Sequence, residues 1–503
     1  MKTVLMLLAA AAQVLSAAGN CETLKSMALE HGAVTLARTV AAGEFTPRFS
    51  PAGGAALPGD NVFRKLPQFC RVAATLRPVE DSEIGIEVWL PETGWNGKLE
   101  AVGNGAWAGS IGYAALAAAV AAGYAAASTD TGHKGNNVQF VVGHPEKLVD
   151  FAWRSVHEMT VAAKAIAAGY YGSRIKRAYF NGCSTGGRQA LTEAQRFPND
   201  YDGIVAGAAA NYPTHLQGAQ VWTAQAAHRI AAGYIPPEKY AVIHKSVLEA
   251  CDALDGVKDG VLEDPTRCHF DPASIECKNG DGPACLTAPQ VETAKRIYAG
   301  PVDSRTGRNL FPGLEPGSEM GWATLAGPKP MDLAAETYQY LVFHDPRWSF
   351  LQFDPVADMA AAQRAIGPLM DATDPHLEPL FAHGGKLLMY HGWADPGIAP
   401  RNSVNYYESV VEATGGAAKA RDSIRLFMVP GMGHCRGGDG TDSFDAVSAL
   451  DSWVTQGKAP AEIPAAHATK GVVDKTRPLC PYPQAAVYKG SGDVNRAENF
   501  TCR

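Results

Sequence analysis

The stretch that most constrains the fold is IKRAYFNGCSTGGRQALTEAQRF (175–197). Its first part is a short apolar run typical of a strand, and its last part has helical spacing. Between them, Gly182, Ser184 and Gly186 form a Gly-x-Ser-x-Gly pattern, which in a strand–turn–helix context makes a sharp turn that lifts the serine hydroxyl above the sheet. Such a turn needs glycines, because it is strained and the helix after it packs closely. The pentapeptide alone is a weak signal, but the strand and helix around it strengthen it.

Strand-like and helix-like segments alternate around this turn. Apolar strand patterns occur at 83–91, 98–105, 123–133 and 202–209, and helical spacing covers about 151–170. A chain that alternates in this way builds a mostly parallel sheet with helices on its faces. The sequence therefore predicts the α/β class.

The alternation stops near Ala210 and resumes at 386–396 and 423–435. Both later segments are apolar strands that end in loops carrying Asp or His. Residues 211–383 are rich in Pro, Gly, aromatic residues and paired cysteines, and they indicate helices and irregular loops. The simplest account is one α/β domain, 19–210 and 384–503, with 211–383 inserted between two of its strands. A separate middle domain is less favoured, because the flanking halves would lack the strands to close a sheet.

The chain begins MKTVLMLLAAAAQVLSAAGNC, with one lysine, an apolar stretch and then small residues. This pattern predicts a secretory signal peptide over residues 1–18 and an extracellular or periplasmic protein. The alternative is a buried N-terminal helix. No other apolar run approaches membrane length, so no membrane association is expected. The net charge of -7, without a long basic run, gives nucleic-acid binding little support.

All ten cysteines follow the predicted signal peptide. An even number in an oxidising compartment suggests five disulfides, although spacing alone leaves the pairing open. The absence of a Cys-x-x-Cys pair argues against a zinc site. Three closely spaced pairs suggest local links: Cys251/Cys268, Cys277/Cys285 and Cys480/Cys502.

A serine hydroxyl becomes a nucleophile when a histidine takes its proton, and a carboxylate holds that histidine in one tautomer. Asp395 follows the first of the two later strands, and His434 follows the second. The order Ser184, Asp395, His434 is that of the α/β-hydrolases. Alone, His434 would more readily be a structural histidine in a Gly-rich loop, but the set of three favours catalysis. His391 precedes the strand-end loop and is interpreted as structural.

Two backbone N–H donors are needed to stabilise the oxyanion that such a serine generates. We expect one at Thr185, the residue after the nucleophile, and the other at Gly105 or Ala106 in the loop VGNGAWAG (102–109). Cys183 precedes the serine and Cys435 follows the histidine, so a triad would bring these cysteines together. We therefore predict a Cys183–Cys435 disulfide, against the alternative of two unrelated buried thiols.

The segments GCSTGGRQAL and GMGHC, taken with Asp395, resemble the tannase and feruloyl esterase family of secreted α/β-hydrolases. The resemblance extends to CDALDGVKDGVLEDPTRC and to RPLCPYPQAAVYKGSGDVNRAENFTC, and so covers nearly all of the mature chain. It implies an α/β-hydrolase fold in which Ser184, Asp395 and His434 are the triad and 211–383 is a lid domain over the site. It also implies five disulfides: Cys21–Cys70, Cys183–Cys435, Cys251–Cys268, Cys277–Cys285 and Cys480–Cys502.

An acidic loop within the insertion carries Asp252, Asp255 and Asp259. Hard oxygen ligands at short, uneven spacing suit Ca²⁺, although the spacing is not that of an EF-hand. By composition a solvated acidic turn is an equal alternative. The family resemblance favours calcium, with the backbone carbonyls of Val257 and Val261 completing a structural site.

The sequence thus predicts an exported serine esterase of aromatic acid esters, with feruloyl (hydroxycinnamoyl) esters of plant polysaccharide as the preferred substrates. A threonine directly after the nucleophile, here Thr185, resembles the residue found there in the feruloyl esterase members of the family. The alternatives are a tannase-type hydrolase of galloyl esters, another aromatic monoester hydrolase, and a secreted binding protein on a hydrolase fold. Aromatic side chains of the insertion could stack on a substrate ring, but we expect most of them in its core: Trp222, Tyr338, Tyr340, Trp348 and Phe350.

Overall fold

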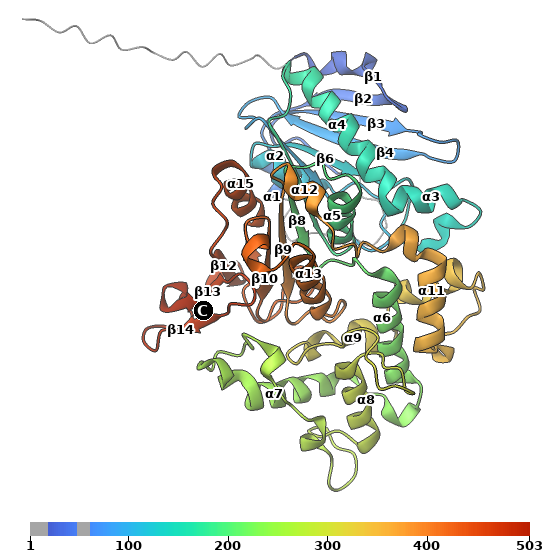
Figure 1. The fold of residues 1–503 in the computed structure, drawn as a ribbon, viewed down its shortest axis with the longest axis vertical. Coiled ribbons are helices and arrows are strands. Elements are labelled where there is room, and N and C mark those ends of the chain that lie inside the picture. The colour runs from blue at the N-terminus through green and yellow to red at the C-terminus, as the bar shows by residue number, and fades with distance from the viewer. Residues whose placement is uncertain (1–18, 48–60) are drawn as a thin grey trace, which may run out of the picture.

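A computed structural model describes residues 19–47 and 61–503 of the chain (Figure 1). The predicted signal peptide, residues 1–18, lies outside the described residues.

A ten-stranded sheet forms the centre of the molecule. Its strands follow one another in space in the order β1-β2-β3-β4-β6-β5-β7-β8-β9-β10. Their bounds are β1 Ala28–Leu29, β2 Gly32–Val40, β3 Phe69–Leu76, β4 Ile84–Pro91, β5 Lys98–Val102, β6 Ala125–Thr129, β7 Arg177–Cys183, β8 Gly203–Gly207, β9 Lys386–Gly392 and β10 Ile424–Val429.

The sheet is more mixed than the sequence pattern predicts. Strands β6, β5, β7, β8, β9 and β10 run parallel to one another, as the βα alternation indicates. Strands β1 to β4 instead form an antiparallel meander that joins the sheet through β4 and β6. Two of these pairings have a local cause, because the connections between β1 and β2 and between β3 and β4 are too short to hold the crossover that a parallel pair requires.

Both faces of the sheet are buried. Along β7, Ala178 and Phe180 belong to one hydrophobic core and Tyr179 to the other. Along β8, Ile204 and Val205 divide in the same way. This alternation follows from the two-residue period of a strand, and burial of both faces explains the nearly continuous apolar runs in the sequence.

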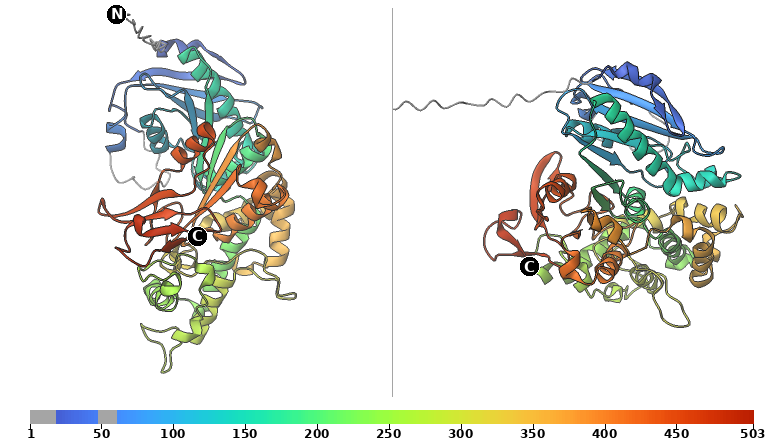
Figure 2. Two further views of the ribbon diagram at one scale, coloured as in Figure 1. Left: turned by 60° about the vertical axis from the view of Figure 1, so that its left-hand side comes forward. Right: turned by 45° about the horizontal axis from the view of Figure 1, so that its top comes forward.

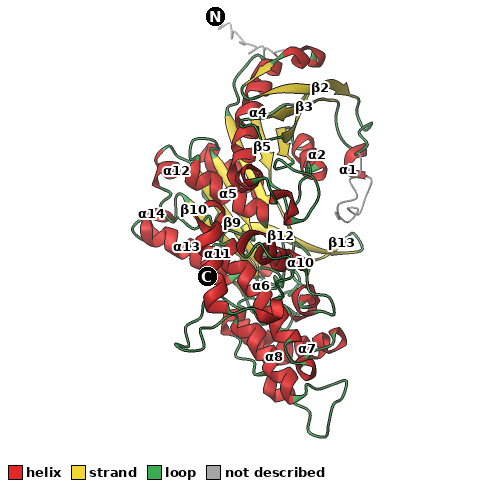
Figure 3. Cartoon of the chain, turned by 90° about the vertical axis from the view of Figure 1, so that its right-hand side faces the viewer, coloured by secondary structure: helices red, strands yellow, loops and turns green. Residues whose placement is uncertain are grey.

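Helices cover the two faces of the sheet (Figure 3). One face is closed by α4 (Ser155–Tyr171), α5 (Thr185–Arg196) and α13 (Arg401–Ala413), and the other by α2 (Tyr113–Ala121) and α15 (Ala446–Gln456). Helix α4 ends at Gly172, which takes the left-handed conformation common after a helix. Three short helices complete this part of the chain: α1 (Asn61–Arg64), α3 (Pro145–Val149) and α14 (Ala417–Ala420).

The segment between β8 and β9 is helical, as predicted, and contributes no strand to the sheet. We call residues 211–383 the helical insertion. Its helices α7 and α8 lie at the opposite end of the molecule from β1–β4 (Figures 1 and 2). The bounds of its helices are α6 Pro213–His228, α7 Tyr240–Cys251, α8 Ala288–Ala299, α9 Ala323–Ala326, α10 Asp332–Glu336, α11 Pro355–Met370 and α12 Glu378–Ala382.

One hydrophobic core lies within the helical insertion, and a second lies between the insertion and the loop after β9. One surrounds Trp322 between α7 and α8, and another surrounds Tyr338 between α6 and α11. Tyr338 stacks on Trp348, with ring centroids 5.1 Å apart. Trp222, Trp348 and Phe350 pack against the cluster around Tyr338, whereas Tyr340 packs against a further cluster that includes Trp107 and Phe151 of the sheet domain. None of these five aromatic side chains lines the cavity that contains Ser184.

The end of the chain forms two small antiparallel sheets. One contains β11 (Ser443–Phe444), β12 (Ile463–Thr469) and β13 (Val472–Leu479), and the other contains β14 (Ala486–Tyr488) and β15 (Phe500–Cys502). Arg477 on β13 forms an ion pair with Asp259 of the helical insertion. The C-terminal strands therefore contact the acidic loop singled out in the sequence.

The five disulfides have the pairing that the family resemblance implies. Cys21–Cys70 links the N-terminal segment to β3, and Cys480–Cys502 closes the C-terminal segment. Cys251–Cys268 and Cys277–Cys285 close loops of 17 and 8 residues within the helical insertion. The predicted Cys183–Cys435 bond is present and spans 252 residues.

Candidate active site

Ser184 lies on the turn between β7 and α5, as the sequence predicts. Its φ of 65° is in the left-handed region, which residues with a side chain rarely adopt. Backbone bonds hold the turn in place: Ser184 N donates to Gly207 O at 3.0 Å, and Ser184 O accepts from Arg188 N and Ala210 N at 3.0 Å each. The hydroxyl therefore stands at the end of a buried strand in a conformation fixed by its neighbours.

Two glycines allow this turn to be so tight. A Cβ atom at Gly182 would lie 2.4 Å from Gly186 O, and one at Gly187 would lie 2.4 Å from Gly207 O. Both positions lack the space for any side chain. The glycines thus serve the close helix–strand contact that the sequence analysis inferred from the motif.

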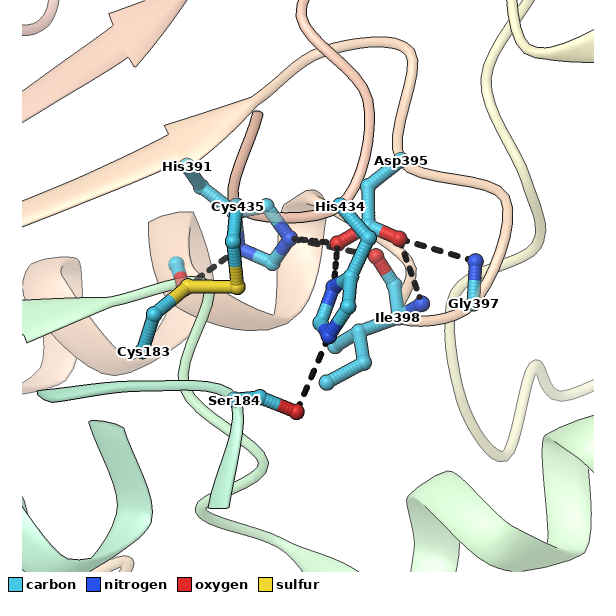
Figure 4. Close-up of a disulfide and its surroundings, with 9 residues drawn as sticks. Cys183, Ser184, His391, Asp395, Gly397, Ile398, His434 and Cys435 are labelled. Carbon is cyan, nitrogen blue, oxygen red and sulfur yellow. Dashed lines mark hydrogen bonds and ion pairs between the residues drawn. A yellow bond between two sulfur atoms is a disulfide. The ribbon is translucent and has the colours of Figure 1, made fainter. Parts of the chain in front are cut away.

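Asp395 and His434 lie on the loops after β9 and β10 and meet Ser184 at the same edge of the sheet (Figure 4). The Ser184 hydroxyl and His434 Nε2 are 2.9 Å apart, and His434 Nδ1 and Asp395 Oδ2 are 2.6 Å apart. Strands β7, β9 and β10 are parallel members of one sheet, so their carboxyl ends lie together. The structure brings together the three residues that the sequence placed far apart along the chain.

The Asp395 carboxylate is fully buried and anchored on both oxygens. Gly397 N and Ile398 N donate to Oδ1 at 2.8 and 3.0 Å. His434 and His391 both contact Oδ2. The carboxylate is thus held by hydrogen bonds besides the one to His434 (Figure 4).

His391 also contacts Asp395, although the sequence indicated only a structural role for this histidine. Its Nε2 lies 3.1 Å from Asp395 Oδ2 and 3.1 Å from Ile398 O, which are both acceptors. Nε2 must therefore carry the proton, and Nδ1 accepts from the Ser403 hydroxyl at 2.8 Å. A sequence signal existed, because His391 is the last but one residue of β9 and lies four residues before Asp395.

The charges of these groups are coupled. Burial by itself raises the pKa of Asp395, but the His434 charge and the hydrogen bonds from His391 and His434 outweigh it, so this pKa lies well below its usual range. Burial lowers the pKa of His434, and the neighbouring Asp395 carboxylate raises it by more, so the net pKa is above the ordinary 6.5. Asp395 is consequently ionised and able to stabilise a protonated His434.

The Cys183–Cys435 disulfide joins the neighbours of the serine and the histidine directly, with an S–S distance of 2.06 Å and 6.1 Å between the Cα atoms (Figure 4). It therefore links the turn after β7 to the loop after β10. Cys435, like Ser184, has a positive φ, of 63°. The covalent link limits how far the histidine can move from the serine.

A cavity of about 670 Å³ opens beside Ser184 and His434. The sheet domain contributes one wall, including Ala106, Trp107 and Thr185, and the helical insertion contributes the other, including Leu216, Gln217, Gln220, Met331 and Leu333. The lining is mainly apolar, which suits a small ligand with an aromatic ring. A second cavity, of about 660 Å³, lies beside Tyr298 and Arg401. Its lining includes none of Ser184, Asp395 and His434.

The three predicted oxyanion residues, Thr185, Gly105 and Ala106, all line this cavity. Thr185 begins α5, where a backbone N–H has no intrahelical acceptor. The Thr185 hydroxyl donates to Ala106 O at 2.8 Å, which holds the 105–106 segment against the start of the helix. Ala106 itself has a φ of 48°.

The acidic loop of the insertion is folded back on itself. The Asp252 carboxylate accepts from Asp259 N and Gly260 N, and the Asp255 carboxylate accepts from Val257 N. Asp255, Val257, Asp259 and Val261, four of the five predicted ligands, line one small cavity of about 10 Å³. Lys475 and Arg477 of β13 contact Asp259, which neutralises part of the acidic charge.

A second group of potential metal ligands lies elsewhere, at α4 and the end of α5. Ligand atoms of His157, Glu193 and Asp200 are within 4.8 Å of one another. His157 already donates to Asp200 at 2.7 Å, and Lys164 contacts Asp200 as well. None of these three residues lines the cavity beside Ser184.

Comparison with known proteins identifies the family. Residues 70–503 match the family model described as tannase and feruloyl esterase. The chain belongs to the tannase and feruloyl esterase family. Members of this family are carboxylic ester hydrolases, so the protein is an enzyme of that class and the binding-protein alternative is set aside.

Curated relatives agree with this assignment. An uncharacterized esterase of Xanthomonas campestris pv. campestris is 37% identical, over 97% of this chain and 92% of that protein. A probable feruloyl esterase B-1 of Aspergillus flavus is 34% identical, over 86% of each chain.

Solved structures show the same α/β-hydrolase fold. Feruloyl esterase B from Aspergillus oryzae superposes with a TM-score of 0.89 at 28% identity, over 96% of this chain and 99% of that one. Tannin acyl hydrolase from Aspergillus niger superposes with a TM-score of 0.79 at 23% identity, over 96% of this chain and 94% of that one, which shows likeness of fold alone. Within residues 19–47 and 61–503, none of the helices has the length and hydropathy that a membrane span requires.

Proposed function

We propose that the protein is an exported serine esterase that hydrolyses esters of aromatic acids, with feruloyl and related hydroxycinnamoyl esters of plant polysaccharide as preferred substrates. The observation that carries the proposal is the hydrogen-bonded series Ser184–His434–Asp395 at the wall of a mainly apolar cavity. The relatives named as feruloyl esterases support the substrate class.

Acylation begins when His434 Nε2 takes the Ser184 proton and Oγ attacks the ester carbonyl. A tetrahedral intermediate forms, and its oxygen carries the negative charge. Asp395 holds His434 with Nε2 unprotonated toward the serine and stabilises the imidazolium that forms. His434 then gives its proton to the alcohol oxygen, the C–O bond breaks, and the alcohol leaves.

We assign stabilisation of the oxyanion to two hydrogen-bond donors, the Thr185 N–H and one N–H of the 105–106 segment. Fixed donors directed at the position where charge develops are worth roughly 10²–10³ in rate each. The Thr185 N–H also lies at the positive end of α5, which favours an anion. The Thr185 hydroxyl, which bonds Ala106 O, holds the two donor segments at a constant separation.

Deacylation repeats these steps with water. His434 takes a proton from the water, the hydroxide attacks the acyl carbon, and Ser184 leaves with the proton that His434 returns. The products are the free aromatic acid and the regenerated serine. The helical insertion would act as a lid, because it supplies one wall of the cavity in which the acyl group would lie.

We further propose that Ca²⁺ binds the acidic loop through the carboxylates of Asp252, Asp255 and Asp259 and the carbonyls of Val257 and Val261. The residues fit the ion: all are hard oxygen donors, and four of them surround a cavity of single-ion size. The ion would hold the loop closed between the insertion and β13, a structural role. Chelation should lower the Tm of the wild-type protein but not that of an Asp255→Asn variant, and metal analysis should find about one calcium per chain.

Export is part of the same proposal. The ten cysteines form five disulfides within the described residues, and such bonds persist in oxidising compartments. Disulfide mapping of protein isolated from culture supernatant or periplasm tests it.

The deciding experiment compares hydrolysis of methyl ferulate, methyl p-coumarate and methyl gallate by the wild type and Ser184→Ala. Turnover of the two cinnamates that disappears in the variant supports the proposal. Preference for the gallate keeps the mechanism and makes the enzyme a tannase. Folded wild-type protein that hydrolyses none of the three esters rejects the proposed substrate class.

A further inference from the structure

The loop that carries the candidate catalytic histidine is rich in glycine. We call residues 430–442, which follow β10, the His434 loop. Five of its residues are glycines: Gly431, Gly433, Gly437, Gly438 and Gly440. The loop folds back on itself, since Asp439 N donates to Gly431 O at 3.0 Å. Glycine loses more conformational freedom on folding than any other residue, so the position of this loop depends on its contacts with the rest of the molecule.

The His434 loop is bound to both parts of the molecule. On one side, the Cys183–Cys435 disulfide joins it to the turn after β7. On the other side, Asp439 forms an ion pair with His244 on α7 of the helical insertion, with 3.4 Å between Asp439 Oδ2 and His244 Nε2. The insertion therefore contacts the loop that carries His434.

His244 has a second carboxylate partner inside the insertion. Its Nδ1 lies 2.8 Å from Glu319 Oε2. Glu319 is fully buried, and its other oxygen accepts from the Tyr298 hydroxyl at 2.7 Å and from Gly317 N at 2.8 Å. One imidazole ring thus joins a carboxylate of the insertion core to a carboxylate of the His434 loop.

These two contacts favour a charged ring. A carboxylate faces each ring nitrogen of His244, and both nitrogens carry a proton only in the imidazolium form. Asp439 and Glu319 together outweigh the effect of burial and raise the pKa of His244 to about 9. Lys475 on β13 and His467 on β12 also face Asp439 and favour its ionised form. At neutral pH the ring therefore forms a positively charged bridge between two carboxylates.

We propose that His244 is a positioning residue, which through Asp439 holds the His434 loop against the helical insertion and so keeps His434 at hydrogen-bonding distance from Ser184. This inference rests on the proposed function. His244 does not line the catalytic cavity, so it acts through the loop and not on the substrate. The bridge serves acylation and deacylation alike, because His434 transfers a proton in both.

Loss of the bridge should lower kcat and leave KM nearly unchanged, because the wall of the cavity is not altered. The Asp439 side chain is 62% exposed, and ion pairs open to solvent are weak, so we expect a loss of about fivefold. The loss should also depend on pH. His244 keeps its charge below its raised pKa and loses it as the pH rises through about 9, so above that pH the wild type lacks the ion pair as well.

The test measures kcat and KM from about pH 7 to about pH 10 on whichever of the three methyl esters the wild type hydrolyses fastest, with spontaneous hydrolysis subtracted. It compares the wild type with His244→Gln, Asp439→Asn, the double variant and the control Lys245→Gln. Lys245 is the next residue on α7 and pairs with Glu249 of the same helix at 3.7 Å, so the control removes a charge and leaves the bridge intact. The ratio of wild type to variant at each pH cancels ionisation of the substrate phenol.

We expect similar losses of kcat in the two single variants and the double variant, because each removes the same ion pair. Lys245→Gln should match the wild type. The wild-type to variant ratio should return toward one above about pH 9. His244→Lys, whose ammonium group has an ordinary pKa of about 10.4, should recover part of the loss and retain it to higher pH. Asp439→Asn leaves Glu319 and the insertion core untouched, so it reports on the bridge even where His244→Gln lowers stability.

Three results would overturn the inference and leave the esterase function standing. The first is a wild-type kcat in Asp439→Asn at neutral pH. The second is a loss that stays constant across the pH range, since that is the behaviour of altered packing and not of a charged bridge. The third is a pair of losses that multiply in the double variant, because the two residues would then act independently. Folded wild-type protein that hydrolyses none of the esters overturns the proposed function and this inference together.

Discussion

The sheet and the helical insertion meet at one cavity but are built on different principles. Ser184, Asp395 and His434 stand on loops at the ends of buried parallel strands, and the carboxylate of Asp395 is paired on both oxygens. The insertion consists of helices and turns, and it contributes side chains such as Leu216, Met331 and Leu333 to the opposite wall of the cavity.

Their disulfides differ in the same way. Cys183–Cys435 joins the segments that carry Ser184 and His434 across 252 residues, while the bonds of the insertion close 17 and 8 residues. The difference suggests a division of labour in the proposed enzyme, with the chemistry on the sheet and the shape of the cavity wall set by the insertion. Changes in the sheet should therefore affect every ester alike, and changes in the cavity wall of the insertion should alter the ratio between esters.

The largest expected effect is on the nucleophile. Ser184→Ala should lower kcat on every ester by at least about 10⁴-fold, because the covalent step is lost, with little change in Tm. Steady-state kinetics on purified protein, with calorimetry as the folding control, measure this. Residual turnover above about one percent would mean that another residue attacks the ester.

The disulfides provide the sharpest contrast between the two regions. Replacing both Cys183 and Cys435 by Ala should lower kcat by about 10²-fold on all esters, since a displacement of about 1 Å at the reacting groups costs that much. Replacing Cys251 and Cys268 by Ala should instead lower Tm while leaving kcat near the wild-type value at 25 °C. Similar kcat losses in the two double variants would contradict the division between the regions.

His391 tests whether the support of the aspartate matters to catalysis. His391→Leu removes the N–H bonded to Asp395 Oδ2 and should lower kcat about tenfold with little change in KM. His391→Gln, which keeps an N–H donor, should recover part of the loss. Equal losses in the two variants, accompanied by equal losses of Tm, would indicate packing alone.

The smallest effect concerns pH. The proposed mechanism requires neutral His434, and Asp395 raises the pKa of this histidine above 6.5. The value of kcat/KM should therefore fall as the pH drops through the pKa of His434, which lies above 6.5. Asp395→Asn removes the raising charge, so the remaining activity should persist to lower pH. The two pH–rate profiles on one ester measure the shift, and an acid limb below 6.5 in the wild type would contradict it.

Much of the candidate active site could be predicted from the sequence, because its signals lie in short segments of the chain. Glycines flank Ser184 in a strand–turn–helix pattern, and Asp395 and His434 follow apolar strands in the expected order. The antiparallel run β1–β4 was not anticipated, since an alternating apolar strand is compatible with either direction and the partner decides.

The sequence by itself indicated the three candidate catalytic residues and their order along the chain. It also provided an even number of cysteines, which an oxidising compartment would pair. Only the tertiary structure decided that His391 supports Asp395 and that Gln220 of α6 binds Gly397 in the loop after β9. The reason is physical: a motif is a property of neighbours in the chain, whereas a contact between α6 and the loop after β9 depends on how the insertion packs against the sheet. Packing of that kind sums many small dispersion and hydrophobic terms, and no short segment of sequence contains them.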